Sequence, residues 1–532
     1  MKAFRGLTVV AMSFLCINPA RLLEAQDKDT IGQEIAITHH LRDGDEFGMP
    51  IPYLIGYGQK LFEAKFTIQE GAGRPLSKGT GAPISDPSTP LVFPRNFDRL
   101  SSPEANACSG CHNAPVVGAG GDRVTEVFVL AQRFDHLSFD HSEGVSLRGA
   151  VDESGKFVTL DDVSNDRKTI GMNGSGFLEM IARQMTADLQ SLAASTPPGG
   201  ATHLITKGVA FGVIKRRADG TWDTSKVIGL SAPSTRTSGV TPPTLLILPY
   251  HQAGAVVSIR QFTNNAMNHH HGMQPEERFG SSVDADGDGI AGELTTADIT
   301  AISVFQATMA VPGRVIPNDR TIENAIHDGE KLFDQIGCNS CHLDSLPLDD
   351  HGWIYTEPNP YNPAGNLQVG PTNYPATAPA LKVDLTGNDL PQPRLRPNAR
   401  GIVNVQAYTD LKLHDISATS NPAIDPECEP LDQNQPSGTL GFFAGNCKFI
   451  TRKLWGFYNQ GGAFMHHGKF TTARESIEAH NGEALETKRA FDALSDDRKN
   501  AVIEFLKSLQ VLPPGSRALV VDEHGNARGN AD

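Results

Sequence analysis

Two five-residue stretches combine cysteine and histidine at a spacing that can hold a redox cofactor. They read Cys-Ser-Gly-Cys-His and Cys-Asn-Ser-Cys-His, so both follow the pattern C-x-x-C-H. In this pattern the two thiols bond covalently to a haem, and the adjacent histidine faces the iron as its proximal ligand. The residues concerned are Cys108, Cys111, His112, Cys338, Cys341 and His342. The sequence therefore predicts two covalently bound c-type haems.

A C-x-x-C pair alone could also be half of a zinc site or a redox-active dithiol. Here both pairs end in histidine, and the chain contains no further C-x-x-C. These features favour haem attachment, with zinc and dithiol chemistry as the alternatives.

The start of the chain is typical of a secretory signal peptide. Lys2 and Arg5 precede an apolar run over residues 7–17, and a cleavage region lies near Ala25. We therefore expect residues 1–25 to be removed and the mature protein to be periplasmic, because bacteria attach c-type haem outside the cytoplasm. No other segment has about 18 consecutive apolar residues, so we predict no membrane span.

The chain is acidic, with a formal net charge of −15 at pH 7. This balance argues against binding to nucleic acid or to anionic membranes. It is compatible with a small basic electron donor, such as a cytochrome c or a cupredoxin. A solvated acidic surface is the simpler explanation.

Two cysteines remain once the haem motifs and Cys16 of the signal peptide are set aside. They are Cys428 and Cys447, in a loop rich in proline, asparagine and glycine. In an oxidising compartment they should form a disulfide worth about 3 kcal/mol. The alternative is two separate buried thiols.

Similar segments precede the two haem motifs. Residues 57–62 read Tyr-Gly-Gln-Lys-Leu-Phe, and residues 328–333 read Asp-Gly-Glu-Lys-Leu-Phe. In the second copy, apolar residues at helical spacing run almost directly into Cys338, as in the first element of a cytochrome c domain. A helix that begins after Ser495, with one apolar face, should pack against it.

This layout predicts a mostly α fold with minor β structure. We expect two cytochrome c-like haem domains with long loop-rich insertions, over residues 26–310 and 311–532. Residues 171–194 and 294–309 are each expected to form a helix within the first domain.

The sixth position on each iron decides the function, so histidines after each motif are the candidates for it. Thr472 and Glu475 form a capping box, which predicts a short helix that begins there. His480 then lies two turns further on, on the same face as Ala473 and Ile477. A face of small residues that carries one histidine can approach a haem closely.

The segment around His480 resembles the bacterial di-haem cytochrome c peroxidases, and most closely the di-haem oxidoreductases often described as thiol oxidoreductases. Their pattern L-W-G … F-L-H-D-G-R-x-x-T-x-x-E-A-I-x-x-H-G-G-E-A corresponds here to residues 454–456, 464–469 and 472–484. The resemblance covers both haem motifs, the repeat and the last 80 residues, and the middle of the chain only loosely. The chain departs from the pattern at His467, where the family usually has aspartate, and in its long insertions.

The resemblance implies a ligand for the second haem. In the di-haem peroxidases this haem takes a methionine from the same short helix, and His480 occupies the corresponding place. A low-spin haem between His342 and His480 is therefore expected. The alternatives are that His480 is an ordinary histidine at a helix end, or that His466 is the ligand.

The resemblance also implies that the first haem is the reactive one, with a distal side that is open or closed by a histidine that can leave. A segment faintly similar to the peroxidase segment that supplies distal glutamine and glutamate contains Gln274, Glu276 and Glu277, which are candidate catalytic acid–base residues. One of His269, His270 and His271 is a candidate ligand, with His136 and His141 as alternatives. A polar loop or an adventitious metal site would explain the three histidines equally.

An acidic loop resembles a calcium site. Alternating carboxylates with a glycine at the sixth position and a closing glutamate suit a hard cation. The candidate ligands are Asp284, Asp286, Asp288 and Glu293. The glutamate arrives at position ten rather than twelve, so a turn without metal that caps the next helix is the alternative.

We expect a periplasmic di-haem oxidoreductase. Electrons from the small redox donor would enter at the His342 haem and pass to the His112 haem, where a small-molecule oxidant such as hydrogen peroxide would be reduced. The first alternative is an oxidase or oxygenase acting on an organic or protein substrate. The second is an electron-transfer cytochrome in which both irons have two protein ligands.

Overall fold

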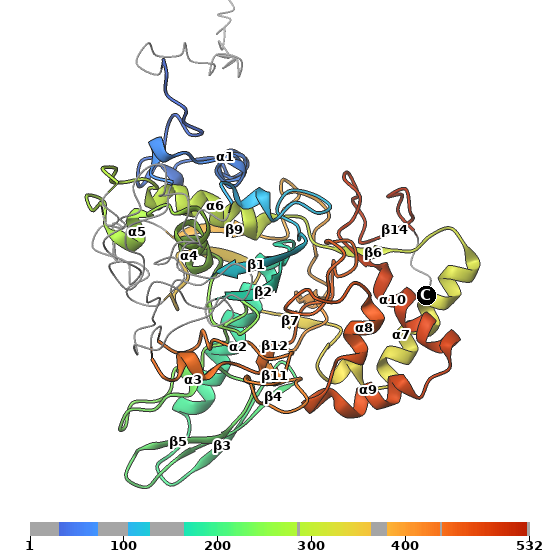
Figure 1. Ribbon diagram of the computed structural model, residues 1–532. Helices are drawn as coiled ribbons and strands as arrows, with labels where there is room; N and C mark the ends of the chain where they lie inside the picture. Colours follow the sequence, from blue (N-terminus) through green and yellow to red (C-terminus); the bar gives the residue numbers. More distant parts are fainter. Residues whose placement is uncertain are drawn as a thin grey trace, which may run out of the picture.

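The structure, a computed structural model, has a mixed α and β architecture (Figure 1). It describes residues 31–72, 105–127, 164–284, 288–362, 380–436 and 439–528. Helices account for 32% and strands for 16%, and the described strands form six small sheets. The predicted mostly α fold is therefore wrong. Parts of the chain expected to be loops instead pair their backbone groups in short strands.

A pair of helices supports the first haem motif. Helix α1 (Ile51–Glu63) packs against α6 (Thr296–Thr308), and Gly58 lies against the backbone of Ala301. A Cβ atom at Gly58 would lie 2.0 Å from the Ala301 carbonyl oxygen, so this approach requires glycine.

A second pair supports the second motif in the same way. Helix α7 (Arg320–Gln335) packs against α10 (Asp496–Ser508), which confirms the predicted contact between the helix before Cys338 and the helix after Ser495. A Cβ atom at Gly329 would lie 1.9 Å from the Ala501 carbonyl oxygen. Figure 1 shows the two pairs on opposite sides of the molecule.

The aromatic residues at the two crossings also correspond. The ring centroids of Phe62 and Phe305 are 5.3 Å apart, and those of Phe333 and Phe505 are also 5.3 Å apart. The short sequence repeat before the haem motifs is therefore part of a larger structural repeat, in which α6 is the counterpart of α10.

Side-chain caps fix where these helices begin. Thr295 and Asp298 form a capping box at the start of α6. At the start of α7, the Asp319 carboxylate accepts hydrogen bonds from the backbone N–H groups of Thr321 and Ile322. Each cap satisfies backbone donors that the helix itself leaves unpaired.

Helix α2 (Ser175–Ala194) joins the two halves of the sequence. It is buried along most of its length and contacts α6 as well as strands β7 (Leu346–Leu348) and β8 (Ile354–Glu357). One cluster of buried apolar side chains consequently extends from Ile37 to Leu411 and includes Trp455. The division into two domains at residue 310 stays a prediction.

Most strand pairs are antiparallel. The sheet β3–β4–β5 projects from the rest of the molecule (Figure 1). In the sheet β13–β6–β14, the pair β6–β14 is parallel. The other sheets are the pairs β1–β2, β7–β10, β8–β9 and β11–β12. The remaining bounds are β1 (Arg123–Val127), β2 (Ser164–Lys168), β3 (Ala201–Thr206), β4 (Val209–Arg216), β5 (Trp222–Val227), β6 (Gly313–Val315), β9 (Leu381–Asp384), β10 (Val403–Val405), β11 (Leu413–Asp415), β12 (Lys448–Ile450), β13 (Leu509–Gln510) and β14 (Val520–Val521).

Five further α-helices complete the described elements. They are α3 (Ala232–Thr235), α4 (Ile259–His271), α5 (Glu276–Phe279), α8 (Ala473–Glu478) and α9 (Leu485–Asp492). In the ranges that the structure covers, no helix combines the length and the apolarity that crossing a bilayer requires.

The predicted disulfide is confirmed. Cys428 and Cys447 are bonded, with their Cα atoms 4.4 Å apart. The bond closes the loop over residues 428–447, directly after Glu427.

Candidate functional site

Both haem motifs begin with one turn of 3-10 helix, η6 (Cys108–Gly110) and η9 (Cys338–Ser340). The ring centroids of His112 and Phe62 are 6.2 Å apart, and those of His342 and Phe333 are 6.3 Å apart. The structural repeat therefore places the two motif histidines equivalently beside their helix pairs.

One cavity of about 490 Å³ is bordered by both motifs. All four motif cysteines and both motif histidines contribute to its wall. Much of the rest is apolar, with Phe62, Phe262 and Leu506 among the side chains that border it. A mostly apolar cavity with a few polar groups at defined places is typical of a cofactor site.

Burial lowers the pKa of both motif histidines to about 4, so their rings are neutral, as a metal ligand must be. The Nδ1 atom of His342 donates a hydrogen bond to the carbonyl of Tyr408 at 3.1 Å. The Nδ1 atom of His112 is buried near the backbone of Ala119 and Ile170, without a well-formed hydrogen bond in the described part of the chain. An Nδ1–H donor directs the lone pair of a histidine to Nε2, the atom that would bind iron.

The helix before His480 is shorter than predicted. The capping box of Thr472 and Glu475 begins α8 as predicted, and His480 follows the end of this helix and borders the cavity. Its Nδ1 atom donates to the Ser476 carbonyl at 2.6 Å, which leaves the Nε2 lone pair for a ligand. Both His480 and His342 border the cavity, and a charge on His480 would lower the pKa of His342.

The competing histidine, His466, also borders the cavity, and it stacks on Phe449 with the ring centroids 3.8 Å apart. Its neighbour His467 accepts a hydrogen bond from the backbone N–H of Lys469 at Nδ1 and donates one from Nε2 to Glu427. The donor atoms of Glu427, His466 and His467 lie within 4.8 Å of one another. Because both ring nitrogens of His467 are used, this group is a hydrogen-bonded cluster rather than a metal site.

His414 is a residue at the second motif that sequence reasoning missed. It borders the cavity, and its two ring nitrogens lie 2.8 Å from carboxylate oxygens of Asp410 and Glu483. Burial alone would lower the pKa of His414, but hydrogen bonds to Asp410 and Cys341 raise it to about 10. The charged ring cannot ligate iron.

Helix α4 brings two of the three consecutive histidines to the first motif. His270 and His271 border the cavity, whereas His269 does not. The Nδ1 atom of His271 bonds to the Ala105 carbonyl, and its Nε2 atom lies 3.3 Å from the Cys108 sulfur. His270 is close enough to His112 that its charged form would lower the pKa of His112.

The three candidate acid–base residues lie elsewhere. Gln274, Glu276 and Glu277 do not border the cavity. Glu277 is an ion-pair partner of Arg260, at 2.6 Å. Burial and the nearby carboxylates of Asp43 and Asp298 raise the pKa of Glu276 to about 7. The structure therefore does not bring these residues to the first motif. His136 and His141 lie outside the described residues.

The acidic loop is partly described. Asp286 lies outside the described residues, and Asp284 accepts hydrogen bonds from the backbone N–H groups of Asp288 and Gly289. Glu293 is buried and accepts a 2.6 Å hydrogen bond from the backbone N–H of Gln274. This carboxylate therefore ties the loop to the turn after α4, and the calcium site stays a prediction.

Two pairs of adjacent basic residues border the cavity, and sequence reasoning missed them. They are Arg167 with Lys168 and Arg452 with Lys453. Burial lowers the pKa of each lysine to about 7, because a charged ammonium group loses its hydration there. Adjacent basic residues also occur elsewhere in the sequence, so the two dipeptides gave no specific signal.

These features fit haem. The cysteine thiols supply covalent attachment, the neutral histidines supply ligands, and the apolar wall suits the porphyrin. The carboxylates of haem would supply the negative charge that the two basic pairs need.

Comparison with known proteins supports the predicted family over one part of the chain. Residues 403–509 match the family model described as "Di-haem oxidoreductase, putative peroxidase". The resemblance to the di-haem oxidoreductases is confirmed for this segment. It contains His466, His480 and the whole of α10, and it lies after both C-x-x-C-H motifs. The match supports a di-haem redox function, with haem as the cofactor.

No curated protein matches the chain at a significant level. Among solved structures, hydrazine synthase from Kuenenia stuttgartiensis, pressurised with xenon, has 11% sequence identity and a TM-score of 0.30. That comparison covers 95% of this chain and 100% of the other. A likeness this weak carries no argument about the fold or the activity.

Proposed function

We propose that the chain is an exported di-haem c-type oxidoreductase that reduces hydrogen peroxide at the first haem with electrons delivered through the second. The observation that carries this proposal is the single cavity bordered by both C-x-x-C-H motifs, with further histidines beside each. The signal peptide predicted over residues 1–25 supports a periplasmic location. A small redox protein is the proposed electron donor.

The chain's own residues would hold the two haems by the same means. Each motif would form two thioether bonds and one histidine ligand, and the basic pairs at Lys168 and Lys453 would neutralise the haem carboxylates. When bound, haem supplies electron transfer where its iron has two strong protein ligands and reduction of small oxidants where one position is open or labile.

The two motifs differ in what stands opposite them. We propose that His480 is the second ligand of the His342 haem, because its Nδ1 atom is fixed by Ser476 and its Nε2 atom remains available. At the first motif, His271 is fixed by Ala105 through its Nδ1 atom, and His270 is the candidate for a labile ligand. This difference supports an electron-transfer role for the second haem and a reactive role for the first.

One observation favours a second candidate function. His270 lies near His112, and a permanent bond from the His270 ring to the first iron would leave both irons with two histidine ligands. The protein would then be an electron carrier.

Spectroscopy and turnover on the purified holoprotein test the proposal. We expect two haems per chain, a high-spin signal or a signal that changes with the redox state from one of them, and peroxide reduction with a reduced cytochrome c as donor. Low-spin spectra from both haems in every redox state, without peroxide or carbon monoxide binding, would support the electron carrier. A His270→Ala variant tests the ligand assignment common to both cases, since it should open the first haem and leave the second unchanged.

A further inference from the structure

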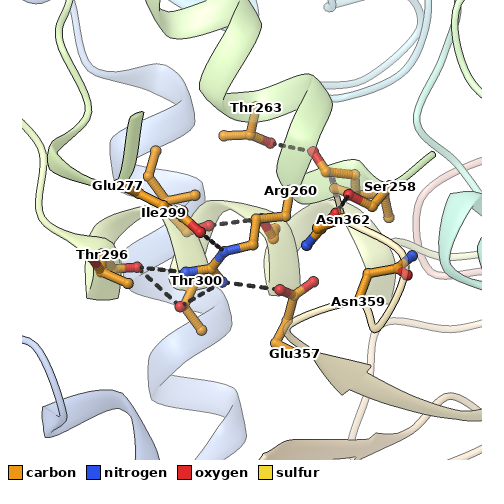
Figure 2. A network of polar contacts seen from close by, with 12 residues as sticks. Ser258, Arg260, Thr263, Glu277, Thr296, Ile299, Thr300, Glu357, Asn359 and Asn362 are labelled. Carbon is orange, nitrogen blue, oxygen red and sulfur yellow. Dashed lines mark hydrogen bonds and ion pairs between the residues drawn. The ribbon is translucent and has the colours of Figure 1, made fainter. Parts of the chain in front are cut away.

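A network of buried charged side chains lies beside the cavity. Its carboxylates are Glu179, Glu277 and Glu357, which are at most 1% exposed. Figure 2 shows its centre, where Arg260 bonds to Glu277 at 2.6 Å and to Glu357 at 2.9 Å. Arg183 bonds to Glu179 at 2.5 Å on helix α2.

The charges in this network do not balance if every group is ionised. In the described part of the chain, the ion pairs of the three carboxylates use two guanidinium groups, those of Arg183 and Arg260. The charge of Arg260 also acts on the buried carboxyl group of Glu46, which would add a further negative charge if ionised. An uncompensated charge in the protein interior is costly, so a carboxyl group of this network binds a proton readily when further negative charge arrives nearby.

Glu179 is the member of the network that contacts the cavity wall, through Tyr250 and Ile259. Tyr250 borders the cavity, and its hydroxyl lies 3.4 Å from Glu179 Oε2 while donating a 2.8 Å hydrogen bond to the Ser175 carbonyl. A lone pair of the Tyr250 oxygen can therefore face Glu179, and rotation of the hydroxyl would turn its proton from Ser175 to an acceptor in the cavity. A protonated Glu179 can donate to that lone pair.

The groups that face Glu179 come from four parts of the chain. Arg183 on its own helix bonds to Oε1, Asn359 donates to the same oxygen at 2.8 Å, and the backbone N–H of Ile259 donates to Oε2 at 2.8 Å. Glu357 and Tyr355 act on it from β8. Burial raises the pKa of Glu179, the charge of Arg183 opposes this rise, and Glu357 adds to it.

We propose that Glu179 is a proton-transfer residue that exchanges protons with the first-haem side of the cavity through the hydroxyl of Tyr250. This rests on the proposed function, since it requires haem to bind there. Each electron that enters from the donor adds a negative charge to the cavity, and Glu179 takes up one proton to compensate it. Reduction of one hydrogen peroxide to two water molecules consumes two electrons and two protons, and Glu179 passes these protons one at a time.

Redox titration of the holoprotein at several pH values tests this proposal. In the wild type, the reduction equilibrium of the first haem should change up to tenfold per pH unit, which is about 59 mV for one electron. Glu179→Gln should abolish this dependence. Glu277→Gln is the matched control in the same network. In this variant the pH dependence should remain but move to a lower pH range, because removal of a nearby negative charge lowers the pKa of Glu179.

Infrared difference spectra between the reduced and oxidised protein give a second readout. The carbonyl stretch of a protonated carboxyl group should appear on reduction, remain in Glu277→Gln and disappear in Glu179→Gln. Tyr250→Phe should retain this band and the pH dependence but slow proton uptake at least tenfold, which keeps the proposal testable if Glu179→Gln does not fold.

An unchanged pH dependence in a folded Glu179→Gln variant would overturn the proposal, and so would unchanged proton uptake in Tyr250→Phe. Loss of peroxide turnover in the wild type, with the pH dependence intact, would instead overturn the proposed function alone.

Discussion

At the residue scale, the roles of the histidines are set by their hydrogen bonds. His480 donates from Nδ1 to a backbone carbonyl and keeps a lone pair at Nε2, whereas His467 uses both nitrogens and His414 is held charged by two carboxylates. Sequence proximity to a haem motif does not distinguish these cases. The ring that remains neutral and directs a free nitrogen into the cavity is the candidate ligand.

Removal of the imidazole at position 480 should change the spin state of one haem. We expect His480→Ala to convert the second haem from low to high spin, because the iron would lose a strong ligand. Electron paramagnetic resonance and visible absorption would measure this change. His466→Ala is the control and should leave the second haem low-spin; the reverse pattern would make His466 the ligand.

Glu276 should make stability depend on pH. Burial, Asp43 and Asp298 raise its pKa from 4.5 to about 7, so the folded state binds more protons than the unfolded state between these values. The free energy of unfolding should therefore fall as the pH rises from about 4.5 to about 7, by about 1 kcal/mol after allowance for solvent screening at this half-buried site.

Glu276→Gln should remove that part of the pH dependence and stabilise the protein above pH 7. Denaturant titrations at pH 4.5 and pH 8 would measure it. An equal effect of the substitution at both pH values would contradict the assignment to Glu276.

At the scale of elements, the molecule repeats one helix crossing. Gly58 and Gly329 each lie against an alanine carbonyl, and Phe305 and Phe505 each follow that alanine by four residues. The sequence predicted the first helix of each pair from the shared Gly-x-Lys-Leu-Phe. It did not identify α6 as the counterpart of α10, because α6 is buried on all sides and lacks the polar face of α10.

Two glycines of α1 should respond oppositely to the same substitution. Gly58→Ala should destabilise the protein by about 1–3 kcal/mol, because the new Cβ atom would clash with Ala301. At Gly56 an added Cβ atom would have no other atom within 4 Å, so Gly56→Ala should stabilise the protein by about 0.5–1 kcal/mol. Thermal unfolding of both variants would measure the difference, and equal effects would show that the close crossing is not required.

At the scale of the whole molecule, the prediction of fold class was wrong for an identifiable reason. The haem motifs and the terminal helix have strong local signals, whereas strands such as β7, β10 and β11 are three residues long and owe their formation to partners far away in the chain. Three residues give no periodicity to detect. The basic pairs at the cavity were missed for a related reason, because burial of Lys168 and Lys453 depends on the assembled fold.

The disulfide contributes at this scale, since it constrains the long segment that follows the second motif. Replacement of both Cys428 and Cys447 by serine should lower the free energy of unfolding by about 3 kcal/mol, from a chain separation of 19 residues. Denaturant unfolding would measure the loss, and chemical reduction of the wild type should reproduce it. No change in either experiment would indicate that other contacts already hold the loop.

Because both motifs open into one chamber, their metals would share a single electrostatic environment. Charge placed on either centre would then alter the affinity of the other for its electron. A reductive titration should accordingly proceed in two steps that are more widely spaced than the intrinsic potentials of the centres, so that a half-reduced form accumulates between them.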